Sequence, residues 1–146
     1  MQFRQLTKDD IPSLLELYVQ LDPKNAGLDC KKSLEIWERQ IGGNSNIKYF
    51  GAVEGEKVVS SCYCVIIPNL SNYNQPICFV ENVVTDKDFR KQGLARKVVQ
   101  MAVEAAKSAG CYKVILQSGI ARKEAHKFYE SLGFNGDSKK AFDMRL

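Results

Sequence analysis

The sequence has little of what metal sites and disulfide frameworks require. Its five cysteines include no CxxC pair, and His126 is its single histidine. Cys62 and Cys64 stand two apart in a strand-like run, too close in sequence for ordinary disulfide geometry. We therefore interpret the cysteines as reduced, small hydrophobic residues, and we expect no metal.

Long apolar runs are also lacking. No run approaches the roughly 20 apolar residues that cross a bilayer, and the first ten residues, MQFRQLTKDD, contain no apolar segment of a secretory signal. We expect a cytoplasmic protein without a membrane partner. The net charge of +4 suits an anionic ligand. Because no basic stripe with interleaved aromatic residues occurs, we expect no nucleic-acid partner.

The length and the hydrophobic pattern predict one α/β domain. The chain has 146 residues, of which 45% are hydrophobic, enough for one core, and we expect a single domain over 1–146. The element order is β-α-α-β-β-β-α-β-α-β. The strands are expected at 3–6, 48–54, 57–68, 77–85, 112–117 and 141–146, and the helices from Thr7 to Pro23 and at 31–43, 93–109 and 122–134. Strand 77–85, the next helix and strand 112–117 form a βαβ unit, which implies a mixed sheet.

The join between the third strong strand and its helix, TDKDFRKQGLARK, is the most informative stretch. Amides in the first turn of a helix lack intrahelical acceptors, so they bind anions. Gly93 and Ala95 are small enough for an anion to approach, and four basic residues, Arg90, Lys91, Arg96 and Lys97, add charge. The phosphate motifs GxxxxGKS/T and GxGxxG are both missing. The join fits a diphosphate, although by itself it also fits a solvated helix cap.

The stretch from Phe79 to Phe134 resembles the GNAT acetyltransferase superfamily. The residues that carry the resemblance are VENVVTDKDFRKQGLARKVVQMAVEAAKSAGCYKVILQSG and the later EAHKFYESLGF. The resemblance implies a mixed, mostly antiparallel sheet and binding of acetyl coenzyme A through the pattern Q/R-x-x-G-x-G/A, with Ala95 at its last position. The coenzyme-binding residues that it implies are Val83, Val84, Thr85, Arg90, Lys91, Gln92, Gly93, Leu94, Ala95, Arg96, Ser118 and Phe128.

The same resemblance implies catalytic roles for two residues. Tyr129 matches the tyrosine that protonates the departing thiolate, although a packed structural aromatic is the alternative. Glu81 matches a carboxylate that removes the amine proton directly or through water, although a plain polar strand residue is the alternative. The Val83 amide is expected to hold the thioester carbonyl oxygen. Asn82 shares the face of Glu81 only if a bulge interrupts the strand.

The sequence therefore predicts an acetyl-CoA-dependent N-acetyltransferase that acts on a small primary amine by direct attack in a ternary complex. It looks like small bacterial stand-alone members of the superfamily. ENVV, GCYK and FYESLGF are also similar to glucosamine-6-phosphate N-acetyltransferases, which supplies one alternative; a non-catalytic acetyl-CoA-binding regulator is the other. We expect the acceptor side between Leu14 and Gly43 and in PNLSNYNQP, where Trp37 and Tyr73 could line it, although the helical spacing of Trp37 also fits the core. The last strand suggests a homodimer.

Overall fold

The computed structural model describes all residues from 1 to 146. The chain forms two compact units, Met1–Ile115 and Leu116–Leu146. No helix combines the length and the apolar character that a membrane crossing requires. The expectation of a single domain stays a prediction.

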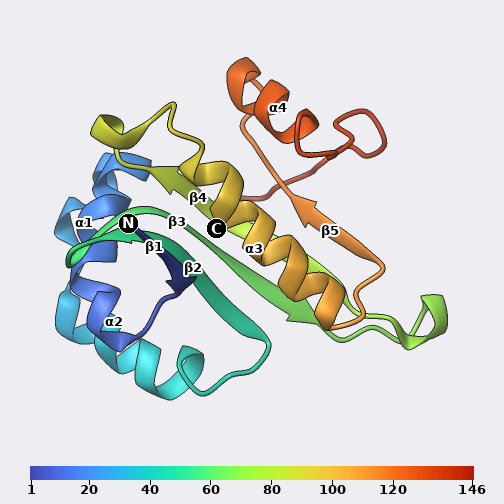
Figure 1. Cartoon of the computed structure of the whole chain (residues 1–146). Coiled ribbons are helices and arrows are strands. Elements are labelled where there is room, and N and C mark those ends of the chain that lie inside the picture. The colour runs from blue at the N-terminus through green and yellow to red at the C-terminus, as the bar shows by residue number, and fades with distance from the viewer. The chain divides into compact units, whose positions relative to one another are not determined.

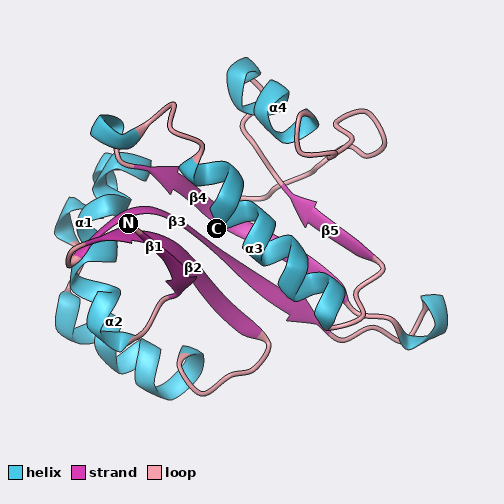
Figure 2. Ribbon diagram, in the orientation of Figure 1, coloured by secondary structure: helices cyan, strands magenta, loops and turns pink.

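The sheet is built from consecutive strands in the order β1-β2-β3-β4-β5 (Figure 2). The strands are β1 (Gln2–Gln5), β2 (Ile47–Glu54), β3 (Lys57–Ile67), β4 (Ile77–Thr85) and β5 (Lys113–Leu116). The first four pair antiparallel. The Tyr112 N–H donates to the Pro76 carbonyl at 3.1 Å, which joins the starts of β5 and β4, and their arrows run the same way in Figure 1. The predicted mixed, mostly antiparallel sheet is confirmed.

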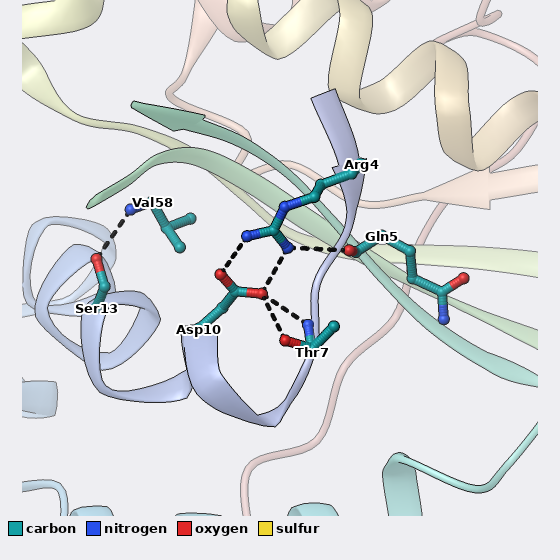
Figure 3. Close-up of polar contacts among 6 residues, drawn as sticks. All are labelled: Arg4, Gln5, Thr7, Asp10, Ser13 and Val58. Carbon is teal, nitrogen blue, oxygen red and sulfur yellow. Dashed lines mark hydrogen bonds and ion pairs between the residues drawn. The ribbon is translucent and has the colours of Figure 1, made fainter. Parts of the chain in front are cut away.

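Helices cover both faces of this sheet. Helices α1 (Ile11–Leu21) and α2 (Cys30–Ile36) lie on one face, and α2 continues into a π-helical turn, Trp37–Ile41. Helix α3 (Leu94–Ser108) crosses the opposite face (Figures 1 and 3). Short 3-10 turns occupy Lys8–Asp10, Pro23–Gly27, Asn72–Asn74 and Lys87–Phe89.

Apolar side chains fill both faces. The core under α1 and α2 is formed by Leu6, Ile11, Leu14, Leu17, Tyr18, Trp37, Val53, Val58 and Val84. On the α3 face, the Cys62 thiol lies 3.6 Å from the carbonyl oxygen of Val98. All five cysteines are free thiols. No group of three or more histidine, cysteine or acidic side chains is arranged to hold a metal ion.

The predicted cap at Thr7 begins the 3-10 turn Lys8–Asp10, which leads directly into α1. Asp10 accepts a hydrogen bond from the Thr7 N–H at 2.7 Å, and its two carboxylate oxygens each lie 2.7 Å from an Arg4 guanidinium nitrogen (Figure 3). The hydroxyl of Ser13 on α1 accepts from the Val58 N–H at 2.8 Å. Because Asp10 is buried, this fork ties β1 firmly to the start of α1.

The second unit contains α4 (Lys123–Glu130), close to its predicted place. The prediction of a last strand over 141–146 is wrong, because these residues form no strand. Their alternation of apolar and charged residues fits a half-buried strand, yet Phe142 and Met144 are both 84% exposed. A strand needs a hydrogen-bonded neighbour as well as a pattern, and this segment has none.

Candidate active site

A bulge interrupts β4 at the predicted site residues. Ser61 pairs with Val84 and Tyr63 pairs with Glu81, so Asn82 and Val83 both lie opposite Cys62. Asn82 has a left-handed backbone, with φ of +53°. A bulge bends its strand and leaves the extra residue out of the ladder. From the sequence, Asn82 shares the face of Glu81 only where such a bulge interrupts the strand.

The bulge brings Glu81 and Asn82 to neighbouring positions on the α1/α2 face. The charge of Glu81 contributes to the raised pKa of Tyr63, after the larger effect of burial. The Asn82 side chain approaches the Tyr18 hydroxyl, although it does not form a hydrogen bond of normal geometry. Three consecutive residues, 81 to 83, are half-buried where a regular strand would alternate.

Beyond β4, a buried aspartate fixes the turn. Asp86 is 2% exposed, forms an ion pair with Lys57 Nζ at 2.7 Å, and accepts from the Asp88 N–H at 3.0 Å. The Lys57 ammonium is the main reason that the pKa of Asp86 lies below its ordinary value. Gln20 of α1 accepts from the Lys87 N–H at 2.9 Å. The turn is therefore held from both β3 and α1.

The residues that follow form an anion cradle, defined here as 90–96. Lys91 and Gly93 have φ of +62° and +76°, and Arg90 Nε donates to the Thr85 carbonyl at 3.2 Å. The first backbone bond of α3 runs from the Lys97 N–H to the Gly93 carbonyl, so the amides of Leu94 and Ala95 precede the helical ladder. A Cβ added at Gly93 would meet nothing within 4 Å. Space and amide donors therefore coincide, which fits the diphosphate of acetyl coenzyme A.

The remaining predicted residues of the first unit have structural contacts. Val84 is buried in the core under α1 and α2. The hydroxyls of Thr85 and Ser60 lie 2.8 Å apart. Leu94 is buried. The Lys97 ammonium lies 4.7 Å from the centre of the Phe3 ring. The backbone around the bulge and the cradle is thus fixed by packing on both sides.

Three predicted residues, Ser118, Phe128 and Tyr129, belong to the second unit. The Ser118 hydroxyl is buried and has no hydrogen-bond partner in the structure, so it has capacity for a ligand. The Tyr129 ring packs against Phe128, with centroids 5.1 Å apart. His126 Nε2 lies 2.8 Å from the Gly119 carbonyl oxygen, a contact that stabilises the local loop.

The sequence prediction missed an aromatic row on the α1/α2 face. Tyr49 and Tyr63 stack with centroids 4.8 Å apart and planes 13° apart, and Trp37 meets Tyr49 edge-on at 5.4 Å. Tyr63 pairs in turn with Glu81, so the row ends at the bulge. Trp37 is a core residue at the other end. Tyr73 is 98% exposed in its loop.

The βαβ unit with an anion cradle at the helix start forms a site suited to a diphosphate. The model of the acetyltransferase (GNAT) family matches residues 11–134, and the chain therefore belongs to this family. It is an N-acetyltransferase with acetyl-CoA as its co-substrate, as the resemblance implied.

Individual relatives cover the whole chain. The glucosamine 6-phosphate N-acetyltransferase of Trypanosoma brucei brucei is 29% identical over 148 residues, which span 100% of this chain and 95% of that protein. A candidate acetyltransferase from Agrobacterium tumefaciens strain C58 superposes with a TM-score of 0.92 at 36% identity and full coverage of both chains. A transcriptional regulator from Bacillus halodurans C-125 superposes with a TM-score of 0.89 at 26% identity, covering 99% of each chain.

Proposed function

We propose that this enzyme acetylates a small primary amine by direct attack on acetyl-CoA within a ternary complex. The observation that carries the proposal is the position of Glu81. Its half-buried carboxylate lies at the β4 bulge, on the strand that leads into the anion cradle, and it forms no ion pair or hydrogen bond in the structure. An unpaired carboxylate beside a donor site is suited to receive the proton of an amine.

The donor is held by backbone and by charge. The amides of Leu94 and Ala95, with the positive end of the α3 dipole and the Arg90 side chain, bind the diphosphate. The Val83 amide, at the bulge, donates to the thioester carbonyl oxygen and stabilises negative charge as it develops there. The unpaired hydroxyl of Ser118 and the ring of Phe128 supply further contacts to the coenzyme arm.

The reaction needs two proton transfers. The amine nitrogen attacks the carbonyl carbon, a C–N bond forms, and the C–S bond to the coenzyme breaks. Glu81 accepts the proton that the amine loses, directly or through water. Tyr129 gives a proton to the thiolate as it leaves, so the products are an amide and the free coenzyme thiol.

Glucosamine 6-phosphate is the second candidate acceptor. The support is the name and the full coverage of the trypanosomal relative. A sugar phosphate would require a basic cluster on the acceptor side in addition to the cradle. A product assay with glucosamine 6-phosphate and acetyl-CoA separates this candidate from other amines.

A coenzyme-binding regulator without catalysis is the candidate from another class. It is supported by the description of the Bacillus halodurans neighbour as a transcriptional regulator. The unpaired carboxylate of Glu81 favours the enzyme, since binding of the coenzyme alone has no use for a proton acceptor.

The test is a panel of polyamines, amino sugars, aminoglycosides, amino acids and peptide N-termini, scored for thiol release from acetyl-CoA. We expect release with at least one amine, and a decrease of about 100-fold in kcat for Tyr129→Phe. Coenzyme binding without release across the panel would favour the regulator. Unchanged turnover in Tyr129→Phe would remove the assignment of the acid.

A further inference from the structure

The aromatic row leads from the core to the half-buried carboxylate of Glu81. It begins in the core at Trp37, continues through the stacked rings of Tyr49 and Tyr63, and ends at the Glu81 carboxylate. Tyr49, Tyr63 and Glu81 are register neighbours on β2, β3 and β4, so their side chains share one face of the sheet. Burial decreases along it, because Trp37 is buried whereas Tyr63 and Glu81 are half-buried. The exposed end of the row therefore joins a π face to a negative charge.

A buried polar group, the hydroxyl of Tyr18, lies beneath the aromatic row. The Tyr18 hydroxyl is buried, lies near Tyr49, Tyr63 and Asn82, and has no hydrogen-bond partner. Burial raises its pKa, so it stays a neutral hydroxyl that can donate and accept. A buried polar group without a partner costs free energy unless something else satisfies it. A ligand amine or hydroxyl at the bulge would do so.

The strands offer no positive charge to this face. Strands β2 to β4 carry two lysines and no arginine. Lys48 lines a groove on the opposite face together with Phe50 and residues of α3. Lys57 is paired with Asp86. A phosphate next to Tyr63 would meet the Glu81 carboxylate, which would repel it.

We infer that Tyr49, Tyr63 and Glu81 form the acceptor subsite, with the buried Tyr18 hydroxyl beneath them. This subsite binds a primary amine that is attached to an aromatic or similarly flat ring. The ring packs against the part of Tyr63 that Tyr49 leaves uncovered, next to Glu81. The ammonium lies beside Glu81, whose opposite charge attracts it. This assignment rests on the proposed function, because it names the substrate class of the same site.

Equilibrium binding tests the subsite without turnover. Trp37 is the only tryptophan of the chain and contacts Tyr49, so its fluorescence reports on the row. The probes are 2-phenylethylamine and propylamine, which lacks the ring. We expect 2-phenylethylamine to bind at least tenfold more tightly. Equal binding of the two probes would overturn the inference.

Matched variants test whether the Tyr63 ring contributes to binding of the amine. Tyr63→Leu should weaken binding of 2-phenylethylamine about five- to tenfold, and Tyr63→Phe should retain it, since the ring remains. Tyr112→Leu is the control, because Tyr112 lies before β5 and its ring contacts Lys113, not the row. Thermal unfolding checks that each variant is folded. Unchanged affinity in a folded Tyr63→Leu would contradict the subsite.

The two proposals fail differently. If 2-phenylethylamine binds through Tyr63 but no amine releases thiol, the proposed catalysis fails and the subsite stands. If glucosamine 6-phosphate is acetylated at a rate that Tyr63→Leu leaves unchanged, and 2-phenylethylamine does not bind, the subsite fails and acetyl transfer stands.

Discussion

The anion cradle follows strand β4 in the chain, and the aromatic row ends at Glu81 on the same strand. The two regions are nevertheless built from different parts of the chain. The cradle consists mainly of backbone: two left-handed residues, Lys91 and Gly93, followed by helix amides within one continuous segment. The row consists of side chains from the π-helical turn, β2 and β3 and ends at Glu81 on β4, with Tyr49 and Tyr63 brought together by pairing. One region is local in sequence, and the other exists only after the sheet forms.

This difference explains what each region can do. Under the proposed function, the backbone cradle binds the diphosphate, a group that is the same in every reaction, and it tolerates changes in the surrounding side chains. A row of side chains changes with each substitution and is suited to select the acceptor. The first three predictions test whether the two regions can be altered separately.

The largest effect is expected on the acceptor side. Glu81→Gln removes the proton acceptor and keeps the shape, so kcat should decrease about 100-fold at neutral pH. Calorimetry should show that the affinity for acetyl-CoA changes less than about twofold, because the cradle is untouched. A variant that turns over at the wild-type rate would show that Glu81 is a plain polar strand residue.

The next largest effect is expected on acetyl-CoA binding at the anion cradle. Gly93 and Gly110 have φ of +76° and +75°, and neither has an atom within 4 Å of an added Cβ. Alanine at either position should cost about 1–2 kcal/mol of unfolding free energy through left-handed strain. Only Gly93→Ala should also weaken acetyl-CoA, by about tenfold, because the methyl group occupies the cradle. Equal coenzyme affinities in the two variants would argue against the cradle.

A smaller effect is expected where the turn is anchored. Asp86→Asn removes the ion pair with Lys57 and weakens the bond from the Asp88 N–H. We expect a loss of about 1–2 kcal/mol in denaturant unfolding, since Lys57 is half-exposed and keeps its hydration. The affinity for acetyl-CoA should decrease only a few-fold. An unchanged unfolding midpoint would mean that the turn is held by other contacts.

The smallest effect is on the pH dependence of stability. Hydrogen bonding to Arg4 and to Lys57, respectively, places the pKa values of Asp10 and Asp86 below the ordinary value. Their contribution is therefore complete above the unfolded pKa of about 3.9 and is lost as the pH falls through the lower folded values. Unfolding free energy should decrease below about pH 4, and less steeply in Asp86→Asn. Parallel wild-type and variant curves would contradict this.

Local signals made much of the fold predictable. Strand β4 begins and ends where the pattern indicates, and the Thr7–Asp10 spacing marks the first helix correctly. The cradle was predictable because its glycine, its basic residues and its place at a strand–helix join are all contiguous. The chain departs from prediction at 141–146, where alternation occurs without a partner strand.

The aromatic row was not predictable because it depends on two irregularities. Next to the hairpin turn, Val53 pairs with Val58, and a register shift between Ala52 and Val53 then brings Tyr49 opposite Tyr63. Without the shift, Tyr49 would face Cys62 and Tyr63 would point to the other side of the sheet. The second irregularity is the bulge at Asn82. Neither follows from composition or spacing.

Binding of acetyl-CoA by the cradle and the β4 bulge is tested most directly by a titration of the 15N-labelled protein with acetyl-CoA, followed through backbone amide shifts. We predict that the Leu94, Ala95 and Val83 amides shift most and saturate together, because they donate to the diphosphate and the thioester. Tight binding that leaves these three amides unshifted would contradict this prediction.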